Sequence, residues 1–236
     1  MFGERLVKAA IVDYGLGNLF SVKHACEHVG MEAVITASPR DMVQADLVIL
    51  PGVGAFGDAM AALKALDLIG PLKEVASSGK ALFGICLGMQ LLMTESWEFG
   101  RFKGLDIIEG EVVKFEDPVG PHGKLKVPQV GWNRVYREIQ GEASANTQIC
   151  GRDRWDRSAL QGLKDGEFMY FVHSYYVKPA SEGVILSASS YGNIEFCSSI
   201  KYRNIFASQF HPERSGPQGL RIYQNLASSV QKADWE

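Results

Sequence analysis

Apolar and polar positions follow two different patterns in the N-terminal half of the chain, and these patterns predict strands alternating with helices. Nearly continuous apolar runs, typical of strands buried on both faces, cover residues 7–14, 47–50 and 81–86, and a shorter strand pattern covers 32–36. Between them, apolar residues recur every three or four positions, as on one face of a helix, over residues 22–29, 56–66, 72–78 and 87–94. This order predicts an α/β fold with a mainly parallel open sheet and helices on both faces.

The C-terminal half has a different pattern, in which short apolar stretches are broken by Gly, Pro and Asn. The stretches cover residues 107–115, 130–136, 167–177, 184–190, 195–201 and 205–210. They predict antiparallel strands that continue the sheet or form a small side sheet. A last helix is expected to open at 215–217, and the polar, weakly periodic residues 137–161 are expected to form a surface excursion. With 236 residues, the chain is predicted to form a single domain over residues 1–236.

Composition and charge exclude several classes of protein. A hydrophobic content of 46% is ordinary for a globular protein, and a net charge of −3 offers no basic footprint for nucleic acid or an anionic membrane. No apolar run approaches the ~20 residues that span a bilayer, and the N-terminus lacks a signal-peptide core. The cysteines, at 26, 86, 150 and 197, are widely spaced, which argues against a zinc site or a disulfide framework. We therefore expect a cytoplasmic protein without metal, nucleic-acid partner or membrane partner.

The apolar run at 81–86 leads into the most informative motif of the chain, Gly84-Ile85-Cys86-Leu87-Gly88, which passes directly into a helical pattern. This is typical of a nucleophile elbow with cysteine in place of serine, a strained strand-to-helix turn that pushes one side chain out above the sheet. Glycine on either side fits the tight turn, and the Leu87 N–H would be free to stabilise a thiolate or an oxyanion. The alternative is a buried structural cysteine between packing glycines.

Glycine-rich turns follow two other predicted strands. Pro51-Gly52-Val53-Gly54 ends the strand at 47–50, and ligands of open α/β sheets bind at the carboxyl ends of strands, so this loop can lie beside Cys86 and present its N–H groups. A plain strand-ending turn is the alternative. Gly15 and Gly17 follow the first strand, but Phe20 stands where a dinucleotide-binding motif needs its third glycine. We therefore expect no dinucleotide cofactor.

A cysteine nucleophile needs a base, because a free thiol is only a few per cent ionised at neutral pH. His211 is the best of the five histidines, since it ends an apolar strand and the carboxylate of Glu213 can turn onto its other ring nitrogen. His24 and His28 lie four residues apart on the polar side of a helix and are expected to be solvated. Cys86, His211 and Glu213 are therefore the predicted triad, although a His-Pro-Glu turn alone would be interpreted as structural.

Three segments, 51–54, 84–90 and 209–213, resemble the signatures of the class I (triad-type) glutamine amidotransferases. More narrowly, the chain resembles the branch of that family formed by the glutaminase subunits of imidazole glycerol phosphate synthases, from histidine biosynthesis. The blocks that carry this narrower resemblance are 13–18, 51–56, 130–133, 171–175 and 211–216. They spread over nearly the whole chain in the family's order and at similar spacing, which makes the resemblance specific.

The resemblance implies that L-glutamine is hydrolysed to glutamate and ammonia through a γ-glutamyl thioester on Cys86. His211 would protonate the leaving ammonia and then activate water, and Glu213 would orient His211. The resemblance also implies two sets of binding groups. The oxyanion would be held by the Leu87 N–H and by a donor from the loop of Gly52, Val53 and Gly54. The substrate's α-amino and carboxylate ends would be held by Gln90 and by the backbone of Ser174 and Tyr175.

The same resemblance implies a partner, a separate (β/α)8 cyclase or synthase subunit that receives the ammonia in a heterodimer. Asn18, expected from the residues to cap the first helix, and Trp132 match family positions that face this partner, and a large aromatic is a suitable interface anchor. No cofactor is implied. Two departures stand out: residues 137–161 are longer than most members need, and Gln129 stands where many carry His.

The sequence alone leaves several alternatives to this function open. One is a related glutaminase that supplies ammonia to a sugar-amidating enzyme of surface-polysaccharide biosynthesis. The others are a cysteine hydrolase with a different substrate and a non-catalytic binding module with the same fold.

Overall fold

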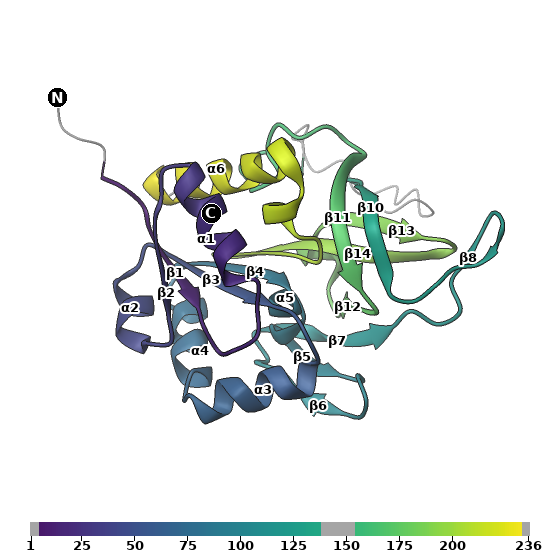
Figure 1. The fold of residues 1–236 in the computed structure, drawn as a ribbon, viewed down its shortest axis with the longest axis horizontal. Coiled ribbons are helices and arrows are strands. Elements are labelled where there is room, and N and C mark those ends of the chain that lie inside the picture. The colour runs from purple at the N-terminus through teal and green to yellow at the C-terminus, as the bar shows by residue number, and fades with distance from the viewer. Residues whose placement is uncertain (1–4, 138–153, 233–236) are drawn as a thin grey trace.

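The computed structural model describes residues 5–137 and 154–232, and its centre is a seven-stranded sheet (Figure 1). The strand order is β13-β14-β15-β4-β3-β1-β2. The parallel strands are β1 (Lys8–Val12), β2 (Glu32–Thr36), β3 (Leu47–Gly52), β4 (Ala81–Cys86) and β15 (Ile205–Ser208). Two strands, β13 (Ile185–Tyr191) and β14 (Ile194–Tyr202), extend the sheet in antiparallel fashion. The predicted mainly parallel sheet with added antiparallel strands is confirmed.

Helices cover both faces of this sheet. On one face lie α1 (Leu19–His28) and α6 (Gly216–Lys232), and on the other lie α2 (Pro39–Gln44), α3 (Phe56–Ala65), α4 (Ile69–Ser77) and α5 (Leu87–Leu91) (Figure 1). Alternate strand residues enter the two apolar clusters: Ile49 and Phe83 pack on the side of α1 and α6, while Val48 and Leu82 pack on the other. This two-sided burial is why the strand sequences are apolar at nearly every position.

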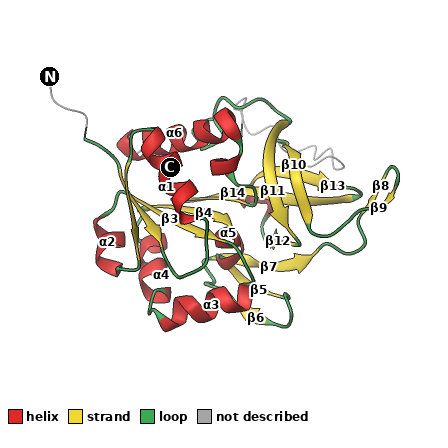
Figure 2. Cartoon of the chain, viewed as in Figure 1, coloured by secondary structure: helices red, strands yellow, loops and turns green. Residues whose placement is uncertain are grey.

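Smaller sheets gather at one end of the molecule, on the right in Figure 2. An antiparallel pair is formed by β10 (Gln129–Val135) and β11 (Glu167–His173). A four-stranded sheet joins β12 (Tyr175–Pro179), β7 (Ile108–Lys114), β5 (Met93–Ser96) and β6 (Phe102–Lys103). A short hairpin joins β8 (Val119–Gly120) and β9 (Gly123–Lys124), and the 3₁₀ turns are η1 (Glu182–Val184) and η2 (Pro212–Arg214). Among the helices of the described residues, none has the length and apolar character that would let it cross a membrane.

Several sequence predictions of element bounds were wrong. The helix expected over 87–94 ends at Leu91, because Met93 already belongs to β5. The stretch 167–177 is two strands that change sheet at Ser174. The stretch 205–210, expected to be antiparallel, contains β15, which pairs in parallel with β4 and antiparallel with β14.

The prediction that residues 137–161 form a surface excursion is wrong for the end of this segment. Residues 138–153 of this segment lie outside the described residues. Beyond them, Trp155 is 1% exposed and Leu160 is fully buried, and the Trp155 Nε1 donates a hydrogen bond to the Leu186 carbonyl (3.0 Å). The end of the segment therefore contributes to the core rather than to the surface.

Candidate active site

Cys86 lies at the junction of β4 and α5 in a strained backbone conformation, with φ +54° and ψ −108°. The glycines on either side are required by close packing. A Cβ on Gly88 would lie 1.8 Å from the Leu50 carbonyl oxygen, and one on Gly84 would lie 3.1 Å from the backbone of Gly88. Strain of this kind costs about 1–3 kcal/mol and is found where the surrounding structure holds a functional residue in place. The turn has the geometry that the sequence predicts for a nucleophile elbow.

His211 and Glu213 form a buried pair at the start of η2. The His211 Nδ1 lies 2.8 Å from the Glu213 Oε1, and the two side chains are 4% and 1% exposed. With the Glu213 carboxylate on Nδ1, Nε2 is the ring nitrogen left for proton exchange, and it has no hydrogen-bond partner among the described residues. The charge of Cys86 is close enough to act on the ring. The structure therefore brings the three predicted residues together from β4 and from the segment after β15.

Electrostatics within this group favour a charged imidazolium. Burial by itself would lower the pKa of His211, but the Cys86 thiolate and the Glu213 carboxylate raise the pKa to about 10 from its ordinary 6.5. His173 behaves in the opposite way: burial lowers its pKa to about 4, and its Nδ1 lies 2.8 Å from the Tyr175 carbonyl oxygen. Of these two histidines, only His211 carries the proton that a general acid gives to a leaving group.

A cavity of about 300 Å³ opens beside Cys86. Most of the predicted binding residues line it, together with others that the sequence did not indicate. Its lining residues are Val53, Gly54, Cys86, Leu87, Gln90, Glu98, Pro128, Val172, His173, Ser174 and Tyr175. The lining combines the Cys86 thiol with polar groups on several elements, as expected of a small-molecule site.

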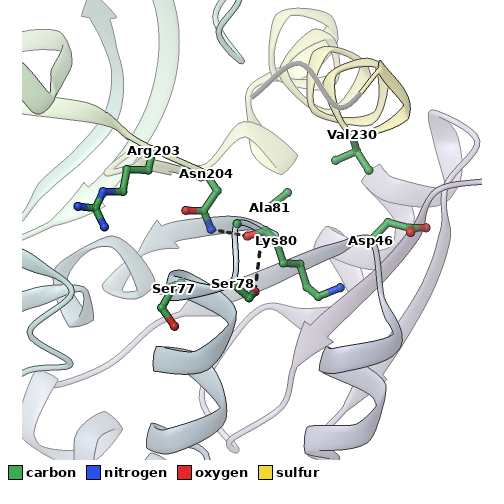
Figure 3. Close-up of a pocket in the computed structure, with 10 residues that line it drawn as sticks. Asp46, Ser77, Ser78, Lys80, Ala81, Arg203, Asn204 and Val230 are labelled. Carbon is green, nitrogen blue, oxygen red and sulfur yellow. Dashed lines mark hydrogen bonds between the residues drawn. The ribbon is translucent and has the colours of Figure 1, made fainter. Parts of the chain in front are cut away.

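A larger cavity, of about 840 Å³, lies where β4 and β15 begin, at the opposite end of these strands (Figure 3). Lys80, Arg203 and Asn204 contribute to its lining, and the Asn204 side chain donates a hydrogen bond to the Lys80 carbonyl (2.6 Å). Its lining within the described residues holds neither cysteine nor histidine. Since open α/β sheets bind ligands at the carboxyl ends of strands, the smaller cavity is the candidate active site.

Glu98 is a lining residue that sequence reasoning missed. Its Oε2 accepts a hydrogen bond from the Phe56 N–H (2.6 Å), and burial raises the pKa of its carboxyl group. A carboxylate in a small cavity suits a ligand with a cationic group. No local motif marks Glu98, because only the turn between β5 and β6 carries it to the cavity.

Gln90 lines the cavity, but its amide nitrogen is already engaged. Nε2 donates to the Tyr175 carbonyl (2.9 Å) and to the Gln209 Oε1 (3.1 Å). Any contact of Gln90 with a ligand therefore falls to its Oε1. Gln209, a second residue that sequence reasoning did not single out, also donates its Nε2 to the Cys86 Sγ (3.5 Å).

The end of β3, formed by Pro51 and Gly52, is held in place from the β1–α1 connection. The Tyr14 hydroxyl donates a hydrogen bond to the Pro51 carbonyl (2.7 Å), and burial, with the nearby Cys86 charge, raises the pKa of that hydroxyl so that it stays protonated. A Cβ on Gly52 would lie 2.3 Å from this hydroxyl oxygen. Gly52 thus lies under Tyr14 rather than in the cavity, whereas Val53 and Gly54 line it.

The two residues expected at a partner interface are both exposed. Trp132 is 57% exposed on β10, on the same face as Val130, which is 60% exposed. Asn18 occupies the predicted N-cap position of α1, and its side chain makes no capping hydrogen bond. The exposed Asn18 side chain is therefore not used to cap α1.

Comparisons with known proteins agree with this geometry. A family model described as glutamine amidotransferase class-I matches residues 10–229. The chain is 45% identical over 221 residues to the imidazole glycerol phosphate synthase subunit HisH of Geobacter metallireducens, covering 93% of this chain and 97% of that protein. It is 41% identical over 227 residues to the same subunit of Aquifex aeolicus, covering 96% and 99%. In fold it is similar to PurLQS from Thermotoga maritima, with a TM-score of 0.65 at 18% identity over 96% of this chain and 100% of that one. The chain belongs to the class-I glutamine amidotransferase family and, within it, to the HisH subunits of imidazole glycerol phosphate synthase.

Proposed function

We propose that this chain hydrolyses L-glutamine at Cys86 and passes the ammonia to a separate (β/α)8 synthase subunit of the histidine pathway. The observation that carries the proposal is the buried group of Cys86, His211 and Glu213 beside a cavity of about 300 Å³. The HisH relatives favour this function over supply of ammonia to a sugar-amidating enzyme. A non-catalytic module would have no need of the strained Cys86 backbone or of the charged His211.

The reaction begins with attack of the Cys86 thiolate on the γ-carboxamide carbon of glutamine. The carbonyl oxygen becomes an oxyanion, for which the Leu87 N–H and an N–H of the loop containing Val53 and Gly54 are the donors. His211 gives its Nε2 proton to the amide nitrogen, the C–N bond breaks and ammonia leaves, so that a thioester remains. Water then attacks the thioester while the neutral Nε2 takes its proton, and glutamate and the thiolate are released. Glu213 holds the ring by Nδ1 throughout.

The substrate's other end has complementary groups around the cavity. The Glu98 carboxylate suits the α-ammonium group, and the backbone of Ser174 and Tyr175 suits the α-carboxylate. The Oε1 of Gln90 remains available for an N–H of the substrate. Every step uses groups of this chain, so the proposed reaction needs no cofactor. The buried, free thiols of Cys26, Cys86 and Cys197 support a reducing, cytoplasmic setting.

The outer face of the β10–β11 pair is the proposed docking surface for the synthase subunit. Val130, Trp132 and Phe168 are all exposed there, and the register pairs Trp132 with Tyr170 and Val130 with Val172. The Val172 carbonyl lies 3.9 Å from the Cys86 Sγ, so the same strand borders both this face and the cavity. Ammonia released at Cys86 would therefore emerge beside the partner. Asn18, exposed on the loop that bears Tyr14, is a second proposed contact.

Complementation tests the proposal in a cell. A histidine auxotroph that lacks this subunit is expected to grow with the wild-type gene and not with Cys86→Ala, unless ammonium is supplied in excess. Cys197→Ala is the matched control, because it also removes a buried thiol but from β14, outside the cavity. Growth with Cys86→Ala at low ammonium would contradict the assignment of the nucleophile.

A further inference from the structure

Gln209 reaches Cys86 because of the register between two parallel strands. Residues of β15 pair in order with residues of β4, and the last pair is Ser208 with Ile85. One residue further along the chain, Gln209, just after β15, therefore lies beside Cys86, the last residue of β4. The Gln209 backbone N–H donates to the Ser198 carbonyl (2.9 Å), so the chain remains extended at this point. The side chain of Gln209 is fully buried.

A chain of hydrogen bonds fixes which way the Gln209 amide points. The Tyr175 carbonyl can only accept, so the atom of Gln90 that contacts it at 2.9 Å is the amide nitrogen. That same nitrogen contacts Gln209 at 3.1 Å, so it meets the Gln209 carbonyl oxygen. The Gln209 nitrogen is then the atom that lies 3.5 Å from the Cys86 Sγ. The amide thus presents a donor, and not an acceptor, to the sulfur.

The two polar contacts of the Cys86 sulfur act in opposite directions. The Val172 carbonyl, at 3.9 Å, can only accept a hydrogen bond and so favours the neutral thiol. The Gln209 N–H, at 3.5 Å, donates and so favours the thiolate. Burial of an amide costs free energy unless its polar atoms are bonded, and an apolar side chain of the same size would fill the same space without that cost. The contacts of Gln209 therefore point to a role in the chemistry of the sulfur.

We propose that Gln209 is a positioning residue that holds the Cys86 sulfur in its reactive, anionic form and orientation. Because its Oε1 is bonded to Gln90, which lines the cavity, Gln209 also links the substrate pocket to the nucleophile. A substrate that engages Gln90 stiffens this chain and so fixes the N–H that faces the sulfur. This inference rests on the proposed function only for the identity of the substrate.

The direct test is the pH dependence of Cys86 alkylation by iodoacetamide in the full chain. Gln209→Met keeps the volume and removes the donor, and Gln209→Glu keeps the acceptor for Gln90 but places a negative charge beside the sulfur. We expect the pH of half-maximal alkylation to rise by about one unit in Gln209→Met, and further in Gln209→Glu. We expect kcat for glutamine hydrolysis in the complex to fall about tenfold while KM changes little. Ser198→Ala, a buried change on the neighbouring strand β14, is the control and should leave the alkylation profile unchanged.

The outcomes separate this inference from the proposed function. An unchanged alkylation profile in a variant that keeps the wild-type near-ultraviolet circular dichroism would overturn the inference, since a packing role alone would leave the profile in place. If Gln209→Met fails to fold, the isosteric Gln209→Glu gives the same decision. If the profiles shift but the wild-type complex does not hydrolyse glutamine, the role of Gln209 stands and the proposed function fails.

Discussion

Gly52→Ala, at the last residue of β3, is predicted to displace the loop that follows β3 without unfolding the chain. The added Cβ would lie 2.3 Å from the Tyr14 hydroxyl oxygen and 2.9 Å from the Leu87 Cβ. Tyr14 is 3% exposed and cannot swing away, so either its hydrogen bond to the Pro51 carbonyl breaks or the loop moves. Both results displace the N–H groups that we assign to the oxyanion.

The magnitude follows from these contacts. Overpacking of this kind costs about 1–3 kcal/mol of stability, and loss of the buried Tyr14 hydrogen bond adds about 1 kcal/mol. A folded chain of ordinary stability, about 5–15 kcal/mol, survives this loss. Activity is affected more strongly, because removal of one oxyanion donor lowers kcat by about 10²–10³. We therefore expect a folded protein with severely reduced glutamine hydrolysis.

The assay measures glutamate release by the complex, with urea unfolding as the stability control. Tyr14→Phe removes the oxygen that the new methyl group would strike. If the two substitutions acted independently, their effects on the rate would multiply; we expect Tyr14→Phe/Gly52→Ala to be about tenfold more active than that product. Full activity of Gly52→Ala would refute the assignment of the oxyanion donors to this loop. Strict additivity in the double variant would refute the contact between Tyr14 and the loop as the cause.

Two further predictions concern the charged pair and the docking surface. The pKa of His211 is raised to about 10 from 6.5, so its proton stabilises the fold fully below about pH 6.5, and this stability is lost as the pH rises through about 10. Glu213→Gln removes one cause of the raised pKa. In urea unfolding across that pH range, the free energy of unfolding of the variant should reach its high-pH value at a lower pH than that of wild type. An unchanged pH profile of unfolding would show that Glu213 does not hold the proton on His211. Trp132→Ala, which removes an exposed aromatic, should weaken binding of the synthase subunit by about 30-fold in calorimetry while the folded chain is as stable as wild type. Equal affinity would place the interface elsewhere, and Val119→Ala, also exposed but on the β8–β9 hairpin, is the matched control.

The sequence predicted well those features whose causes are local. The elbow at Cys86 is marked by flanking glycines that its tight packing requires, and His211 carries its acidic partner two residues away. The same holds for the strands and helices of the N-terminal half, since burial on both faces imposes a continuous apolar pattern. Local patterns thus indicated the turn at Cys86, the His211–Glu213 pair and the half of the fold that bears Cys86.

Features that depend on contacts distant in the sequence were missed. Gln209 meets Cys86 only because β15 inserts in parallel beside β4, a pairing that the apolar pattern of 205–210 does not reveal. Glu98 reaches the cavity through β5, a strand whose start was hidden by a helical pattern that continued past Leu91. The contact of Tyr14 with the loop after β3 likewise depends on how two turns pack, and single turns carry no sign of it.

The central claim is that Cys86 releases ammonia for use on another subunit. The most direct measurement compares synthesis of the imidazole product by the reconstituted complex of wild type and of Cys86→Ala, each supplied with glutamine or with an ammonium salt. We predict that Cys86→Ala abolishes the glutamine-dependent rate and leaves the ammonium-dependent rate close to that of wild type, because the synthase subunit then receives ammonia directly. Equal loss of both rates would contradict release of ammonia at Cys86 for a separate subunit.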